Sequence, residues 1–99
     1  MLSSSKESNI YPNQYSIDNI YPNPFNPITK ISFNIDEYSL VNISIFDITG
    51  KLVDNLLNDY RTPGNYSIIW NGDHFNSGIY FIKMNSGKKQ DVRKIMLVK

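Results

Sequence analysis

The chain has 99 residues, enough for one small domain, and its ten Lys and Arg against nine Asp and Glu give a net charge of +1. Charges of both signs are interspersed, which argues against a nucleic-acid-binding stripe or a basic membrane patch, and no apolar run is long enough for a transmembrane helix. Cysteine is absent, so disulfides, zinc–thiolate sites and thiol catalysis are excluded.

Residues 1–14 are polar and show no periodicity, so we interpret them as a flexible linker or a cloning-derived tail. They do not read as a signal peptide, because no apolar segment follows Met1. Tyr15 and Ile17 then alternate with polar residues, as in a short edge strand. We therefore predict a folded domain over residues 15–99.

Residues 21–29 hold three prolines within six positions. The stretch reads Tyr21-Pro22-Asn23-Pro24-Phe25-Asn26-Pro27-Ile28-Thr29. Proline fixes φ and lacks an N–H, and the residue before it is pushed out of the helical region. Neither a helix nor a central strand can form here, so we expect an extended or turning chain. On the residues alone, this stretch is a rigid linker into the domain that carries two large apolar groups, Tyr21 and Phe25.

From residue 29 onward, apolar side chains recur at every second position, which is the period of a half-buried strand. Two such runs are Ile31, Phe33, Ile35 and Val41, Ile43, Ile45. Between Asp47 and Gly50 the composition predicts a hairpin turn with a positive φ at the glycine. Residues 51–57 fit a short helix or a strand, and the neighbouring hairpin signals favour the strand.

The second half of the chain continues this pattern. Residues 62–64, Thr-Pro-Gly, have the composition of a type II turn, and a third clear strand follows with Tyr66, Ile68 and Trp70 on one face. Residues 79–84 are apolar nearly throughout, as in a central strand, and residues 91–98 form a last strand. About seven short strands with regular turn signals predict an all-β antiparallel sandwich, with a closed barrel less favoured.

Patterns that could support catalysis or metal binding are scarce. His74 is the single histidine and lies in a loop. Residues 71–73 resemble part of a calcium loop but lack its alternating acidic ligands. Tyr66 and Trp70 could line a sugar-binding platform, although the alternation points both of them inward. We therefore predict no catalytic residue, no cofactor and no metal site.

Several motifs, in one order, resemble the type A C-terminal sorting domain of the type IX secretion system, a family found in Bacteroidota and related bacteria. The matching segments are Tyr21-Pro22-Asn23-Pro24-Phe25-Asn26-Pro27, Val41 to Gly50, Gly64 to Gly72, Ser77-Gly78-Ile79-Tyr80-Phe81 and Arg93-Lys94-Ile95-Met96-Leu97-Val98-Lys99. Tyr66 replaces a common His and Met84 stands where Leu is commoner, and both keep an apolar inward position. The resemblance covers residues 15–99.

The resemblance implies an immunoglobulin-like sandwich that acts as a secretion signal for an upstream cargo protein absent from this sequence. The implied partners are the outer-membrane translocon and a sortase-like C-terminal signal peptidase, which removes the domain and can attach the cargo to the surface. The implied location is the periplasm in transit, then the cell surface or the medium. Residues expected to contact the translocon are Gly78, Tyr80, Arg93, Lys94 and Lys99. Residues expected to form the structural signature are Tyr21, Pro22, Asn23, Pro24, Phe25, Asn26, Pro27, Asp47, Gly50, Gly64 and Trp70.

A second interpretation stays open, because fold alone does not decide function. The domain could be a non-catalytic immunoglobulin-like accessory module that binds cell wall, carbohydrate or a protein and is never cleaved. The ending at Lys99 suggests a native C-terminus and favours the sorting signal. The cations of the last strand would then contribute charge-assisted contacts to the translocon, whereas in the simpler interpretation they protect a sheet edge from aggregation.

Overall fold

The computed structural model describes residues 16–99, and every regular element in that part of the chain is a β-strand. The strands are β1 (Ile17–Tyr21), β2 (Ile28–Ile35), β3 (Ser39–Asp47), β4 (Leu52–Arg61), β5 (Gly64–Asn71), β6 (Gly78–Ser86) and β7 (Lys89–Leu97). All neighbouring strands pair antiparallel. The predicted immunoglobulin-like antiparallel sandwich of about seven strands is confirmed.

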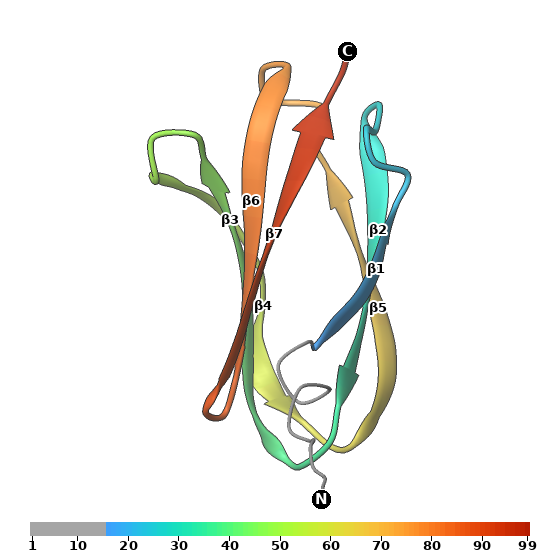
Figure 1. Cartoon of the computed structure of the whole chain (residues 1–99), viewed down its shortest axis with the longest axis vertical. Coiled ribbons are helices and arrows are strands. Elements are labelled where there is room, and N and C mark those ends of the chain that lie inside the picture. The colour runs from blue at the N-terminus through green and yellow to red at the C-terminus, as the bar shows by residue number, and fades with distance from the viewer. Residues whose placement is uncertain (1–15) are drawn as a thin grey trace, which may run out of the picture.

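The strands form two sheets that face each other as separate layers (Figure 1). One sheet has three strands in the order β1-β2-β5, and the other has four in the order β4-β3-β6-β7. Hydrogen bonds across the gap join Ile17 to Asp91 and Trp70 to Asp54. These bonds place β1 opposite β7 along one side of the sandwich and β5 opposite β4 along the other.

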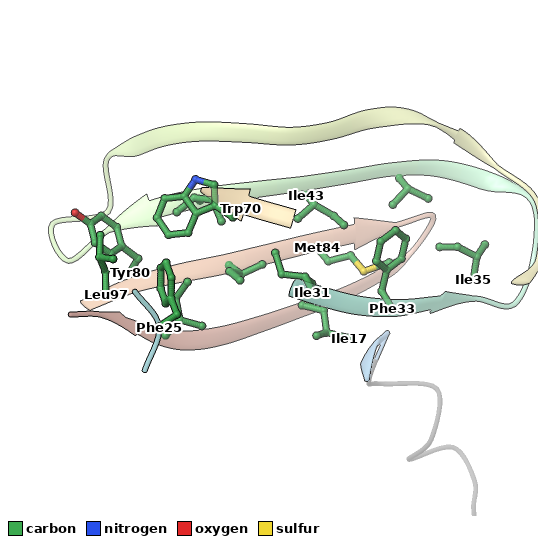
Figure 2. Packing of buried hydrophobic residues seen from close by; sticks show 14 residues of the cluster. Ile17, Phe25, Ile31, Phe33, Ile35, Ile43, Trp70, Tyr80, Met84 and Leu97 are labelled. Carbon is green, nitrogen blue, oxygen red and sulfur yellow. The ribbon is translucent and has the colours of Figure 1, made fainter. Parts of the chain in front are cut away.

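The core lies between the sheets and contains the alternating apolar residues of both inner faces. The fully buried members include Ile31 and Phe33 of β2, Val41, Ile43 and Ile45 of β3, Ile82 and Met84 of β6, and Ile95 and Leu97 of β7. Figure 2 shows Trp70, Tyr80, Phe25 and Leu97 together at one end of this core, with Phe33, Met84 and Ile35 toward the other. Removing this apolar surface from water is the main stabilising term of the fold.

Of two turns predicted from the sequence, one has the expected backbone conformation and the other does not. Between β3 and β4, Gly50 has φ of 89° and donates its N–H to the Asp47 carbonyl at 2.9 Å, which confirms the predicted positive φ. Between β4 and β5, Gly64 has φ of 153°, whereas a type II turn needs about 80° at this position. The type II assignment is therefore wrong, and the physical reason is that this connection crosses from one sheet to the other instead of closing a hairpin.

The remaining strand predictions need only adjusted bounds. Residues 52–57 belong to the strand β4, as favoured, and Lys51 precedes it; β6 is central because it pairs with both β3 and β7. The last strand begins at Lys89, two positions before the predicted start. The short strand expected around Tyr15 and Ile17 is β1, an edge strand, while Tyr15 and the predicted linker 1–14 lie outside the described residues.

Candidate recognition site

The proline segment, residues 22–27, lies beside the outer edge of β7. Phe25 N–H donates to the carbonyl of Met96 at 2.9 Å, and the N–H of Val98 donates to the Phe25 carbonyl at 2.9 Å. The Phe25 side chain is buried in the core, and its ring centre lies 5.4 Å from that of Trp70. This segment is therefore part of the sandwich and not a linker into it.

Asn23 also contacts the outer edge of β7, through its side chain. Its Oδ1 accepts from the N–H of Met96 at 3.0 Å, and its Nδ2 donates to the Lys94 carbonyl at 3.3 Å. Met96 and Lys94 are alternate residues of β7, so their backbone groups point away from β6. Such groups of an edge strand are a template for unwanted pairing when left open. Asn23 and Phe25 together occupy the N–H and C=O of Met96 and the C=O of Lys94.

Two further contacts hold the ends of the proline segment. The hydroxyl of Thr29 donates to the Pro22 carbonyl at 2.7 Å, and the N–H of Gly72 donates to the Pro27 carbonyl at 2.8 Å. The peptide bonds before Pro22, Pro24 and Pro27 are cis. Because proline has no N–H, this segment covers β7 while offering few donors of its own to another chain. The side chains that remain exposed here are Tyr21, Pro22, Asn23, Pro24 and Asn26.

Arg93, one of the residues expected to contact the translocon, takes part in a contact between the two sheets. Its guanidinium donates to the Asp91 carboxylate at 3.1 Å and to the carbonyl of Ile17. The Asp91 carboxylate also accepts the N–H of Ile17 at 3.0 Å. The Asp91 side chain is buried and that of Arg93 is about one-third exposed. Arg93 and Asp91 therefore close the side of the sandwich between β1 and β7.

Lys99 is exposed, yet it is also engaged within the domain. Its Nζ donates to the carbonyl oxygens of Asp73 at 2.6 Å and Phe75 at 3.0 Å, and its backbone N–H donates to the Ser77 hydroxyl at 3.0 Å. The three acceptors belong to the connection between β5 and β6. Lys99 therefore holds this connection against the end of the chain.

Tyr80, a further expected contact residue, is only 7% exposed. Its ring packs against Trp70 and Phe75, with ring centres 5.4 and 6.3 Å away. Its hydroxyl donates to the Asn76 carbonyl at 2.6 Å. Burial raises the pKa of Tyr80, and the negative charge of Asp47 adds to the increase. Tyr80 thus contributes to the core and holds a loop.

Lys94 is the expected contact residue that points fully outward. It lies on the outer face of β7 between Val92 and Met96, whose side chains are exposed as well. Within the described residues its side chain has no hydrogen bond or ion pair.

Gly78, at the start of β6, is half-buried and leaves open space where a Cβ would lie. The five expected residues therefore do not form one patch.

Two signature residues organise the hairpin between β3 and β4. The Asp47 carboxylate accepts the hydroxyl and N–H of Thr49 at 2.6 and 2.9 Å, and the N–H of Lys51 at 3.0 Å. These hydrogen bonds, that from the Thr49 hydroxyl foremost, lower the pKa of Asp47. Gly50 completes the turn with its positive φ. Asp47 and Gly50 are therefore structural.

Trp70, the central signature residue, is 1% exposed, which confirms its predicted place in the core. Its indole N–H donates to the Asp54 carboxylate at 2.9 Å. This bond closes the side of the sandwich between β5 and β4, opposite the contact that Arg93 makes. Burial of Trp70 leaves no aromatic platform for a sugar at this position.

The residues missed from the sequence are Asp91, Asp54 and the capping side chain of Asn23. Asp91 had a detectable signal, because it occupies the same face of its strand as Ile95 and Leu97, and an isolated carboxylate at a core position requires a partner. No sequence signal indicates the pairing of Asn23 with β7, because the two residues that it contacts lie more than 70 positions away.

Other chemistry is limited in the described part of the chain. His74 is exposed. Residues 16–99 contain no group of three His, Cys, Asp or Glu placed to hold a metal ion. Over the same range, no helix is long and apolar enough to cross a membrane.

Comparison with known families gives one result for this chain. The family model described as "Secretion system C-terminal sorting domain" matches residues 19–99. A search of curated proteins found no match. The matched range contains the proline segment, strands β2 to β7 and the end of β1.

Proposed function

Because the chain belongs to the family of type IX secretion system C-terminal sorting domains, we propose that it carries an upstream cargo protein from the periplasm across the outer membrane. A sortase-like C-terminal signal peptidase then removes the domain or uses it for surface attachment of the cargo. The observation that carries the proposal is the extent of the family match, residues 19–99, which includes both sheets and the proline segment.

The structure favours the outer face of β7 as the surface that the translocon contacts. Lys94 lies there between the exposed apolar side chains of Val92 and Met96. A cation on an apolar strand can form a charge-assisted hydrogen bond at the centre of a dry contact. Tyr80 and Arg93 support this surface from inside the sandwich, and their role in sorting is to hold the fold.

An export assay tests the proposal. Residues 1–99 are fused behind a signal peptide and a reporter in a bacterium that has the type IX machinery. The reporter is expected at the cell surface or in the medium, whereas the reporter without the domain stays in the periplasm. Deleting residues 94–99 is a poor probe of the signal, because Leu97 is in the core and Val98 bonds to Phe25.

Single substitutions distinguish a residue that the translocon contacts from a residue that only maintains the fold. Lys94→Ala removes an exposed charge with no partner among the described residues, and Lys30→Ala does the same on the outer face of β2. Lys94→Ala is expected to reduce export while Lys30→Ala leaves it unchanged, with equal thermal stability for both. Equal export of the two variants would overturn the assignment of β7, and periplasmic retention of the complete fusion would favour the accessory module.

A further inference from the structure

The sandwich has four sheet edges, and those of β1 and β7 are protected. The proline segment covers one end of β7, and Asp91 and Arg93 bond to Ile17 near its other end. The strand β1 has five residues, carries a register shift between Ile17 and Asn19 and runs into Pro22. Short length, bulges and proline are the devices that keep an edge strand from pairing further.

The edge of β4 is protected by charge and irregular register. Its pairing with β3 shifts twice, between Ile43 and Ser44 and between Ile45 and Phe46. The strand also carries three charged residues, Asp54, Asp59 and Arg61. An additional strand would meet a bulged ladder lined by charges, which disfavours pairing.

Apart from Pro63 directly before its first residue, the edge of β5 has none of these protections. All eight residues of β5 pair with β2 in one unbroken register. No charged residue occurs in residues 62–72, and the strand itself contains no proline. Its outer face even presents Ile69 with 58% of its surface exposed. A long, regular, uncharged edge is a surface to which another strand adds readily.

The backbone groups that point toward this free edge can be identified from the ladder. The N–H of Gly72 donates to the Pro27 carbonyl, and antiparallel pairs alternate between bonded and non-bonded along a strand. The even-numbered residues of β5 therefore bond to β2, and the outward groups belong to Asn65, Ser67, Ile69 and Asn71. Their N–H and C=O groups have no partner within residues 16–99.

The inner side of the same edge is incompletely covered. Tyr66 and Ile68 of β5 and Leu56 and Leu57 of β4 point toward the core but stay half-buried. The sheet that contains β5 has three strands, while the opposite sheet has four. One added strand beside β5 would complete a second four-stranded sheet and cover these four side chains.

We propose that the free edge of β5 binds an extended, uncharged segment of a partner protein as an additional strand of the sheet. Alternate apolar side chains of that segment cover Tyr66, Ile68, Leu56 and Leu57, and its backbone bonds to the outward groups of β5. A single strand fits better than a second copy of the domain. The inward side chains that a second copy would present along its own β5, Tyr66 and Ile68, already pack against that copy's core and are not free to cover Leu56 and Leu57 here.

The proposal does not depend on export, so it is tested with the purified chain of residues 1–99, labelled with ¹⁵N. The probe is a synthetic peptide with the sequence of β2, Ile28–Ile35, in which threonine replaces Lys30 so that its side chains carry no charge, because β2 already pairs with β5 along its whole length. Hydrogen exchange at Asn65, Ser67, Ile69 and Asn71 is expected to slow by about tenfold or more at saturating peptide. The same peptide with proline at its Ile31 position is the control and should leave these amides unchanged.

Substitutions at Ser67 locate the site. Ser67→Pro removes an N–H that does not bond to β2, so the fold is retained while peptide binding is lost. Ser67→Ala is the matched control and should bind as the unaltered chain does. Should Ser67→Pro unfold, Ser67→Lys blocks the edge by charge instead, and Ser32→Lys, on the residue that pairs with Ser67 in β2, is its control.

Three results would overturn the proposal. One is unchanged exchange at the four outward amides at millimolar peptide. Another is faster exchange of the β2 amides that bond to β5, with no change at the outward amides, which means that the peptide has displaced β2. The last is protection of the outward amides that rises with protein concentration in the absence of peptide, together with dimers in sedimentation, because the occupant is then a second copy of the domain.

Discussion

At the scale of single residues, Asp91 is the most informative side chain in the domain. It occupies a core-facing position of β7 and is 6% exposed. A buried carboxylate costs several kcal/mol unless charge and hydrogen bonds compensate it. The Arg93 guanidinium and the N–H of Ile17 supply that compensation. The pair therefore fixes the first strand against the last one.

We expect Asp91→Ala to lower the free energy of unfolding by about 2–3 kcal/mol, because Arg93 and the Ile17 N–H lose their acceptor. Urea denaturation measures this change. Asp36→Ala is the control, since it breaks the exposed pair between Asp36 and Lys89 and should cost less than about 1 kcal/mol. Equal losses in the two variants would show that the contact between β1 and β7 is not stabilising.

Truncating Trp70 tests how much the packing of the core contributes to stability. Trp70→Ala should cost about 3–5 kcal/mol, the usual range for truncating a buried large aromatic residue. That is a large part of a total stability of about 5–15 kcal/mol, so the domain can become largely unfolded. Trp70→Phe is the control, because it keeps most of the packing with Phe25 and Tyr80 but loses the bond to Asp54. A loss below about 1 kcal/mol in the alanine variant would contradict core placement.

At the scale of elements, the proline segment acts as an edge cover for β7. It is too rich in proline to be a strand, yet Phe25 forms an isolated parallel bridge with Leu97. Phe25 anchors the cover in the core, and Asn23 bonds to the exposed backbone beside it. Proline on both sides of Asn23 limits the backbone freedom that ordering would cost.

Asn23 gives a prediction for this element. Asn23→Ala should lower stability by about 1 kcal/mol, because two hydrogen bonds to β7 are lost at an exposed position. The amide of Met96 should also exchange faster with solvent, because its acceptor is gone. Asn26→Ala is the matched control, since Asn26 lies in the same segment and makes no side-chain hydrogen bond within the described residues. If Met96 exchanges equally fast in both variants, Asn23 does not cap the edge.

At the scale of the whole molecule, periodicity in the sequence predicts which residues face the core but not which strands pair. The alternation of Ile31, Phe33 and Ile35 identifies the inner face of β2, and the structure confirms it. The turn signals between Asp47 and Gly50 predict that β4 joins β3, but nothing local indicates that β5 joins β2 or that β6 joins β3, because those pairings depend on contacts far apart in the sequence. For the same reason, the sequence could not show that Tyr80 and Arg93, which the resemblance assigns to contacts with the translocon, also bond within the domain.

The molecule also has a predictable response to acid. The pKa values of Asp36, Asp47 and Asp59 are lowered from 3.8 by hydrogen bonds, led by those from Lys89, the Thr49 hydroxyl and the Tyr60 N–H respectively. A carboxyl whose pKa is lower in the folded state binds its proton more readily in the unfolded state. Its stabilising contribution is therefore present above pH 3.8 and is lost as the pH falls through the folded value.

Asp47→Asn tests this response in one hairpin. The asparagine oxygen can still accept from Thr49 and Lys51, but it no longer gains a proton in acid. The difference in free energy of unfolding between the unaltered chain and Asp47→Asn should therefore stay constant above about pH 5 and shrink steadily below pH 3.8. Urea titrations at intervals from pH 2 to pH 7 measure that difference. Asp18→Asn is the control at an exposed position on β1, away from the hairpin. A difference for Asp47→Asn that stays constant down to about pH 2 would mean that the carboxylate's bonds in the turn do not favour its charged form.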